Sequence, residues 1–439
     1  MQLIAYDLPD PAPLWALAIA VNAVAVAVAA VQAFRLDRGS PARLFRRALI
    51  RARWGSVARS AGLAVVKDKR RVAQLQAPPL SALVSGPVDR ASGGQARVKV
   101  EPVERLPKLA HGRATPSKAA VVYRVKPPRG GSLDDIAGRV DHLAAAMRAY
   151  QVTLERVRPD RGRLIVTLHD ELTKVRPWPG PGRGVGVTAT GEPLRFPLIG
   201  GHWLIAGVTR SGKSVWLQSV IADVLTSRVP RYITAIDPKV VELSLVAPAV
   251  DRLIVDPAEI GEALAAEHHE VTRRYQQLGL RGLQKLERPT EDMPLRLIIV
   301  DELGEVARQG PGETKDAPKE RLRLLSSLAA IGGGAGVVII CCTQRPSAQL
   351  IGSDLRANLT RRICCRTSDE YGGEAALGDI AGQLRPQDIP MGSKGVAWVV
   401  SEEHPYPQQA RSYWLTSEQI AAIAQAHPAP RPAALEAGG

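Results

Sequence analysis

Aromatic residues and cysteines are scarce in this chain of 439 residues. Phe, Trp and Tyr make up only 4% of it, so alanine, valine, leucine and isoleucine must fill the core. Four cysteines are too few for a disulfide scaffold, and we interpret them as reduced thiols in a cytosolic compartment. No internal repeat is present either. Hydrophobic residues at 45% and charged residues at 23% exclude wholesale disorder, and the length predicts two or three globular domains.

Acidic residues are outnumbered: 43 Asp and Glu stand against 58 Lys and Arg, which gives a net charge of +15. A strongly basic chain favours polyanionic partners, either nucleic acids or anionic membrane surfaces. Charge alone does not separate these two classes of partner.

Residues 14–34 contain no charged side chain, and 21 residues are long enough to cross the hydrocarbon core of a bilayer. Asp7 and Asp10 precede this span, whereas twelve basic residues lie between Arg35 and Arg71. The positive-inside rule therefore predicts a single-pass protein of the cell membrane, with its N-terminus outside and the rest in the cytoplasm. The alternative is a buried Ala/Val helix of a soluble domain.

The basic segment after the span has three interpretations that remain open. It could hold the lipid headgroups of the inner leaflet, touch DNA phosphates, or only fix the topology. From composition we predict seven segments: an N-terminus (1–13), a transmembrane helix (14–34), the basic juxtamembrane segment (35–71), a Pro/Gly-containing linker (72–131), a small α+β module (132–175), a motor domain (176–425) and a Pro/Ala-rich tail (426–439).

The module is predicted from two local signals. Ser132 and Asp135 have the spacing of a capping box before a helix, and the strand-like runs 152–157 and 163–168 flank a Pro-Asp-Arg-Gly turn. Nothing in this module predicts catalytic chemistry.

A phosphate-binding loop follows an apolar strand at 202–206. The pattern G-x-x-x-x-G-K-[ST] is matched by Gly207, Val208, Thr209, Arg210, Ser211, Gly212, Lys213 and Ser214. Its glycines let the backbone curl around phosphate oxygens, and the helix that follows directs free N–H groups at them. Lys213 is predicted to neutralise the β- and γ-phosphates, and Ser214 to bind Mg²⁺.

Other polar residues follow further apolar strands. The run 295–300 ends at Asp301, predicted to hold Mg²⁺ through water, and at Glu302, predicted to orient or deprotonate the attacking water. The strand 337–342 ends near Gln344, predicted to sense the γ-phosphate. Ligands bind at the carboxyl ends of strands in open α/β sheets, so these residues predict one site in an α/β fold.

These residues together resemble the FtsK/SpoIIIE family of DNA-pumping ATPases over about 184–400. Its more specific motifs are Asp237-Pro238-Lys239 with Glu242-Leu243-Ser244, and Thr343-Gln344-Arg345-Pro346. The resemblance implies a RecA-like P-loop ATPase with a largely parallel sheet. It also implies a ring, usually a hexamer, that moves double-stranded DNA with ATP and Mg²⁺. Length, one span and Ala/Arg-rich composition are most similar to conjugative-transfer members from actinobacterial plasmids and integrative elements, which would add other transfer proteins as partners.

The chain departs from this family's pattern at two places. The family's arginine finger usually lies about ten residues before Thr343, where this chain has Gly332-Gly333-Gly334. Either Arg321, Arg323 or Arg362 replaces it, or hydrolysis is slow. Many relatives also carry a winged-helix DNA reader after the motor. Here 39 residues follow Val400, so we do not expect sequence-specific DNA loading by this chain.

Three other functions compete with conjugative DNA transfer. Chromosome segregation at division is the main alternative within DNA pumping. A related motor for protein (type VII) secretion is disfavoured by the single P-loop and by the net charge. An inactive membrane scaffold is disfavoured by the intact Lys213, Ser214, Asp301 and Glu302.

Overall fold

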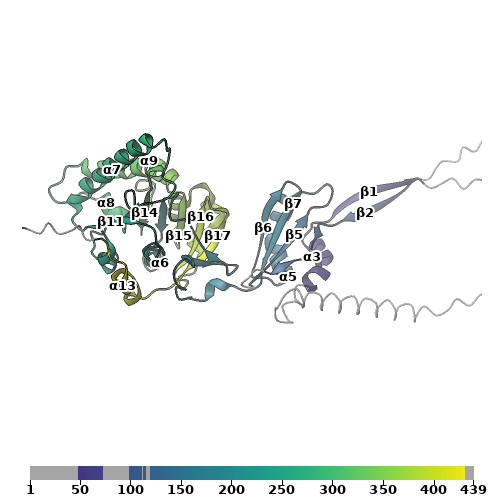
Figure 1. Cartoon of the computed structure of the whole chain (residues 1–439). Helices are drawn as coiled ribbons and strands as arrows, with labels where there is room; N and C mark the ends of the chain where they lie inside the picture. The colour runs from purple at the N-terminus through teal and green to yellow at the C-terminus, as the bar shows by residue number, and fades with distance from the viewer. Residues whose placement is uncertain (1–47, 73–97, 111, 115–118, 431–439) are drawn as a thin grey trace, which may run out of the picture. The chain divides into compact units, whose positions relative to one another are not determined.

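The computed structural model of the chain describes residues 48–72, 98–110, 112–114 and 119–430. It divides into two compact units, Met1–His169 and Asp170–Gly439 (Figure 1). The predicted N-terminus, the predicted span at 14–34 and the end of the tail all lie outside the described residues. Among the helices that are described, none combines the length and the apolarity needed to cross a bilayer.

The first unit is an antiparallel α+β structure. One sheet has the strand order β3-β5-β7-β6, with β4 also paired to β5, and β1 and β2 form a separate two-stranded ribbon. Its elements are α3 (Trp54–Ser60), β1 (Val65–Val72), β2 (Val98–Arg105), β3 (Lys108–Leu109), β4 (Arg113–Ala114), β5 (Ala120–Lys126), α4 (Leu133–Ala137), α5 (Val140–Met147), β6 (Gln151–Arg158) and β7 (Arg161–Thr167).

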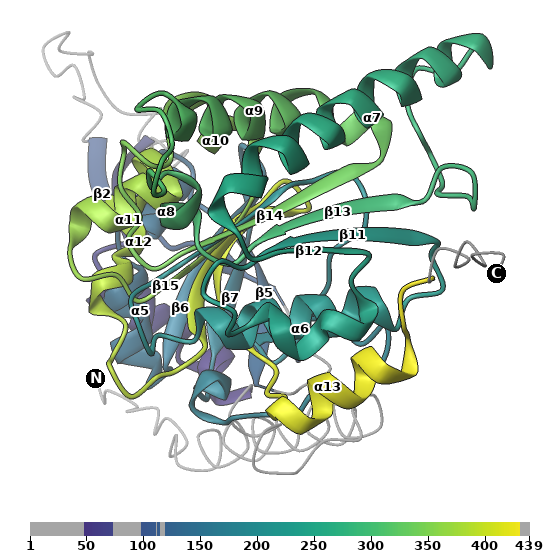
Figure 2. The same cartoon turned by 90° about the vertical axis from the view of Figure 1, so that its left-hand side faces the viewer.

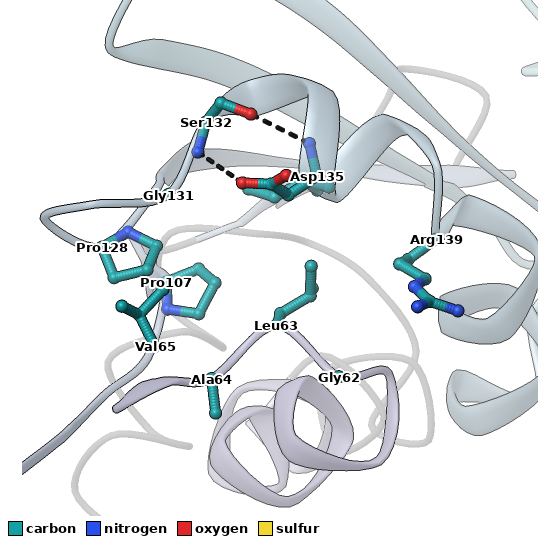
Figure 3. Close-up of a pocket in the computed structure, with 11 residues that line it drawn as sticks. Gly62, Leu63, Ala64, Val65, Pro107, Pro128, Gly131, Ser132, Asp135 and Arg139 are labelled. Carbon is teal, nitrogen blue, oxygen red and sulfur yellow. Dashed lines mark hydrogen bonds between the residues drawn. The ribbon is translucent and has the colours of Figure 1, made fainter. Parts of the chain in front are cut away.

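The predicted capping box is confirmed at the start of α4. The Ser132 hydroxyl accepts a hydrogen bond from the Asp135 N–H at 3.1 Å, and the Asp135 carboxylate accepts one from the Ser132 N–H at 2.7 Å. Figure 3 shows both bonds beside a pocket of about 190 Å³ that Leu63 and Arg139 also line. The helix predicted after this capping box is split into α4 and α5, because the chain leaves the helix at Gly138 and Arg139.

The linker predicted at 72–131 is wrong for its second half. Residues 98–126 supply β2 to β5, and β5 pairs with β7 along six residues of each strand. The residues of β5 alternate between the core and the outside, which buries Val121, Tyr123 and Val125. Part of the segment interpreted as juxtamembrane also belongs to this unit, because Trp54 is buried in its core and donates its indole N–H to the Pro107 carbonyl at 2.6 Å.

The second unit is built on one ten-stranded sheet with the order β12-β11-β13-β14-β10-β15-β16-β17-β8-β9. The pairings from β12 to β15 are parallel, and those from β15 to β9 are antiparallel. The predicted parallel core is thus confirmed, and an antiparallel extension adjoins it. The strands are β8 (Gly186–Thr188), β9 (Pro193–Leu194), β10 (Trp203–Ala206), β11 (Arg231–Ile236), β12 (Arg252–Ile254), β13 (Leu295–Val300), β14 (Val337–Thr343), β15 (Arg361–Cys365), β16 (Val396–Ser401) and β17 (His404–Ser412).

Helices cover both faces of this sheet (Figure 2). On one face α6 (Lys213–Leu225) and α13 (Ser417–Ala426) pack with the 3-10 helix η3 (Leu243–Ala249). On the other face lie α7 (Ile260–Leu280) and α9 (Ala317–Ile331), together with the short helices α8 (Leu303–Val306), α10 (Ser353–Asn358), α11 (Glu370–Leu377) and α12 (Ala381–Leu384). The central strands are buried on both sides, which explains their continuous apolar runs.

The beginning and the end of the second unit, the motor unit, which contains the predicted motor domain (176–425), lie together. The last strand, β17, pairs with β8, and the Trp178 N–H donates to the Trp414 carbonyl at 2.9 Å. The Arg411 guanidinium reaches back to the Leu172 carbonyl at 2.6 Å. Residues 170–175, predicted as part of the small module, therefore belong to the motor unit. The described part of the predicted tail also contacts it, because the Ala429 N–H donates to the Pro248 carbonyl at 3.0 Å.

Candidate nucleotide-binding site

The predicted site residues meet at the carboxyl edge of the parallel strands. The P-loop follows β10 and leads into α6, Asp301 and Glu302 follow β13, and Gln344 follows β14. Because β14 lies between β13 and β10, the three segments are adjacent at this edge. The sheet order thus brings together residues that are more than 130 positions apart in the chain.

Glycine is required at two positions of the loop. Gly207 and Gly212 have φ angles of +156° and +108°, which side-chain-bearing residues rarely adopt. A Cβ atom on Gly212 would also lie 2.2 Å from the backbone nitrogen of Gly395. Within the described part of the chain, no side chain caps the N-terminus of α6. Its first N–H groups are therefore available to a phosphate, as an anion-binding helix start requires.

The Lys213 side chain is hydrogen-bonded to Asp301. Its ammonium donates to the Asp301 carbonyl at 2.8 Å and to the Asp301 carboxylate at 3.0 Å. Both side chains are almost fully buried. Burial by itself lowers the pKa of Lys213, but the neighbouring Cys342, Asp301 and Glu302 together outweigh burial, so the pKa is raised above its ordinary value. The ammonium stays charged, as neutralising a phosphate requires.

The donor set fits Mg²⁺ bound to a nucleotide. Mg²⁺ is usually bound through one or two protein oxygens together with phosphate oxygens and waters, not by an all-protein cage. Ser214 supplies a hydroxyl and Asp301 a carboxylate at the same strand edge. The two predicted metal residues have different hydrogen-bond partners. The Ser214 hydroxyl donates to Glu242, and the Asp301 carboxylate accepts from Lys213.

Glu302 and Gln344 are in direct contact. The Glu302 carboxylate accepts the Gln344 N–H at 3.1 Å and the Gly304 N–H at 3.3 Å. The Gln344 side chain accepts a hydrogen bond from the Thr209 hydroxyl of the P-loop at 3.0 Å. The predicted water-activating carboxylate and the predicted phosphate sensor are therefore linked to each other and to the P-loop.

The three arginines considered as replacements for the missing finger differ in their surroundings. Arg321 is 2% exposed and donates to the Pro257 carbonyl and to Glu313. Arg362 donates to the Leu359, Arg356 and Leu377 carbonyls. Both are therefore engaged inside their own subunit. Arg323 has a side chain that is 67% exposed on α9 and pairs with the exposed Glu320, so of the three it would lose the least by reaching another subunit.

Sequence reasoning missed several contacts at this site. The sequence analysis places Glu242 and Lys239 in a motif without giving them a role at the site. In the structure, Glu242 accepts a hydrogen bond from Ser214, and the Lys239 ammonium lies 3.9 Å from the Glu302 carboxylate. Gly395 was not singled out, yet its N–H donates to the Ser211 carbonyl at 2.8 Å. The motif Asp-Pro-Lys followed by Glu-Leu-Ser was the available signal for the first two. No local signal marks Gly395, because its partner lies 184 positions away.

Comparison with known proteins agrees with this geometry. The sequence model of the FtsK/SpoIIIE family matches residues 168–375. The DNA translocase FtsK of Borreliella burgdorferi is 27% identical over 322 residues, which are 68% of this chain and 40% of that protein. The DNA translocase SpoIIIE of Bacillus subtilis is 27% identical over 300 residues, 59% of this chain and 36% of that protein. This chain therefore matches well under half the length of these relatives.

A solved structure supports the same fold. The pCW3 conjugation coupling protein TcpA, in its monomer form with ATPγS, superposes with a TM-score of 0.51 at 20% identity. The match covers 73% of this chain and 93% of that structure. The second unit therefore has the fold of a P-loop ATPase, and residues 168–375 within it are similar to the FtsK/SpoIIIE family.

Proposed function

We propose that this chain is a membrane-anchored, ATP-driven translocase of double-stranded DNA. It works as a ring of subunits, most simply a hexamer, with ATP and Mg²⁺ bound at the P-loop. The observation that carries the proposal is the buried pair of Lys213 and Asp301 beside Glu302, inside a region of FtsK/SpoIIIE type. Phosphoryl transfer needs mainly positioned charges and an oriented water, and these residues are of the type that supplies them.

Two observations favour DNA as the substrate. The curated relatives are named DNA translocases. The net charge of +15 suits a polyanion, because binding to the DNA backbone is largely electrostatic.

The process is proposed to be conjugative transfer of a plasmid or integrative element. Its support is the Ala/Arg-rich composition and the apolar run at 14–34, which is also the proposed anchor. The likeness to the coupling protein TcpA bears on the fold and not on the process. Chromosome segregation and protein secretion are the outcomes that the experiments must separate.

The test uses the full chain in detergent with linear double-stranded DNA. ATP hydrolysis is measured with and without DNA, and movement is measured as displacement of a third strand annealed to the duplex. We expect DNA to stimulate hydrolysis and Lys213→Ala to lower the rate about 10²- to 10³-fold, because one preorganised charge at the transferred phosphate is lost. The matched control is Lys319→Ala, which changes a lysine whose side chain is 84% exposed on α9.

Each result has a definite meaning. Hydrolysis that ignores DNA would contradict the DNA pump and favour a protein-moving motor. Hydrolysis without strand displacement would contradict translocation. A donor strain with Lys213→Ala that still transfers its plasmid at the normal frequency would contradict the conjugative role, even if the pump itself works.

A further inference from the structure

The side chain that contacts the Ser214 hydroxyl is Glu242, which no part of the proposed function uses. The Ser214 hydroxyl donates to the Glu242 carboxylate across 28 positions of sequence. Asp301, the other predicted metal residue, is occupied by the Lys213 ammonium. The loop after β11 thus holds the hydroxyl that is predicted to bind Mg²⁺.

Hydrogen bonds and packing hold this loop, residues 237–243, in one conformation. Asp237, which is 1% exposed, accepts the Val241 and Leu243 N–H groups, each at 3.0 Å. Val240 has a φ of +55°, an unusual conformation for a branched residue that makes the chain turn sharply here. Leu243 is fully buried in the core beside α6. These anchors on both sides of Glu242 hold its backbone in place, and the hydrogen bond from Ser214 then positions its carboxylate.

The direction of the hydrogen bond matters for a metal ligand. A serine hydroxyl has one proton and two lone pairs, and it can bind a cation only through a lone pair. When the proton is committed to Glu242, the lone pairs are left for the metal and the oxygen becomes more electron-rich. Partners of this kind orient the ligands of a metal and raise its affinity.

Charge also favours a cation at this place. Glu242, Asp301 and Glu302 bring three carboxylates to the edge of the sheet, and the ammonium groups of Lys213 and Lys239 lie among them. A divalent cation held by the Ser214 hydroxyl would therefore have a ligand that is hydrogen-bonded to a carboxylate.

We propose that Glu242 is a positioning residue for Mg²⁺, which acts by orienting the Ser214 hydroxyl. The assignment rests on the proposed function, because it requires that the P-loop binds a nucleoside triphosphate. It gives the Glu-Leu-Ser motif after β11 a specific role in loading the metal. Glu242 is expected to touch neither the nucleotide nor the attacking water.

The experiment separates binding of the metal from binding of the nucleotide. Binding of a fluorescent ATP analogue to the full chain is measured first in EDTA and then during a titration with Mg²⁺. For Glu242→Ala we expect the half-saturating Mg²⁺ concentration to rise about 10- to 100-fold. Affinity in EDTA should stay within about twofold. Glu242→Gln keeps an acceptor without the charge and should fall between the wild type and Glu242→Ala. The control, Glu262→Gln, removes an exposed carboxylate of α7.

An unchanged Mg²⁺ requirement in Glu242→Ala would overturn the assignment. Equal losses in EDTA and in Mg²⁺ would overturn it as well, because Glu242 would then shape the P-loop and not the metal site. If the wild type binds no nucleotide, or if Lys213→Ala binds it as well as the wild type does, the proposed function itself fails. These results are distinguishable because the wild-type titration is interpreted before any Glu242 variant.

Discussion

His202, at the start of the strand that leads to the P-loop, is buried at 5% exposure, and its Nδ1 accepts the Ile339 N–H at 3.0 Å. Burial, with a smaller effect from the positive charge of Arg361, lowers the pKa of His202 to about 4. The ordinary value of an exposed histidine is about 6.5. Between these two pH values the unfolded chain binds a proton and the folded chain does not. The contribution of His202 to the free energy of unfolding is therefore complete above pH 6.5 and is lost as the pH falls towards 4.

This shift gives a prediction for His202→Asn, whose side-chain oxygen can accept the same hydrogen bond but does not titrate. Between pH 7 and pH 5 the wild type should lose about 2 kcal/mol more unfolding free energy than the variant. Denaturant unfolding of both proteins at the two pH values measures the difference. Equal losses in the two proteins would show that His202 is protonated without cost in the folded state.

At the scale of elements, β5 determines where the chain can be shortened without exposing the edge of a sheet. It pairs with β7 on one side and with β3 and β4 on the other. A chain that begins at Ser132 would lack β5 and expose the edge of β7, which is a site for aggregation. A chain that begins at Asp170 removes the first unit as a whole.

We therefore expect opposite behaviour from these two truncations. The chain from Asp170 should melt cooperatively and bind a fluorescent ATP analogue, whereas the chain from Ser132 should aggregate or show a broad transition. Circular dichroism during heating and light scattering check this. If the chain from Ser132 melted as sharply as the full chain does, β5 would be dispensable.

The same element shows what the sequence could and could not predict. The capping box at Ser132 and the P-loop depend on residues close in sequence, and both are where they were predicted. β5 is not predicted, because the prolines around it indicate a linker. Val121, Tyr123 and Val125 nevertheless alternate as the residues of a half-buried strand should. The Ser214–Glu242 contact depends on the loop geometry after β11: the motif marks Glu242 but does not indicate which residue it contacts.

At the scale of the whole molecule, the proposed ring would allow an arginine of one subunit to complete the site of its neighbour. If an arginine of this chain serves that purpose, the exposed Arg323 fits and the internally bonded Arg321 and Arg362 do not. The Gly332-Gly333-Gly334 segment is held from within the subunit, since the Tyr275 hydroxyl donates to the Ile331 carbonyl at 2.6 Å and the Arg274 guanidinium donates to the Ala335 carbonyl at 3.0 Å.

The variants Arg323→Ala and Arg321→Ala are expected to differ, one losing hydrolysis rate and the other losing stability. Arg323→Ala should lower DNA-stimulated hydrolysis by about 10³-fold, the lower end for an arginine that stabilises a transferred phosphate, with an unchanged melting temperature. Arg321→Ala should lower the melting temperature, because it leaves the half-buried Pro257 carbonyl and Glu313 without the buried guanidinium that bonds them. Normal hydrolysis by Arg323→Ala would remove it as a finger and favour a slow motor without one.

The pairing of the first and last strands of the motor unit has a mechanical consequence. A pull on the chain near Asp170 is resisted at Trp414, which exchanges two backbone hydrogen bonds with Arg176 and Trp178, and at Arg411, which holds the Leu172 carbonyl. β17 passes this load to β16, and Gly395, just before β16, is bonded to the P-loop. If the proposed membrane anchor pulls on this unit, the tension would reach the P-loop, so that a stalled subunit and a freely moving one would bind nucleotide with different affinities.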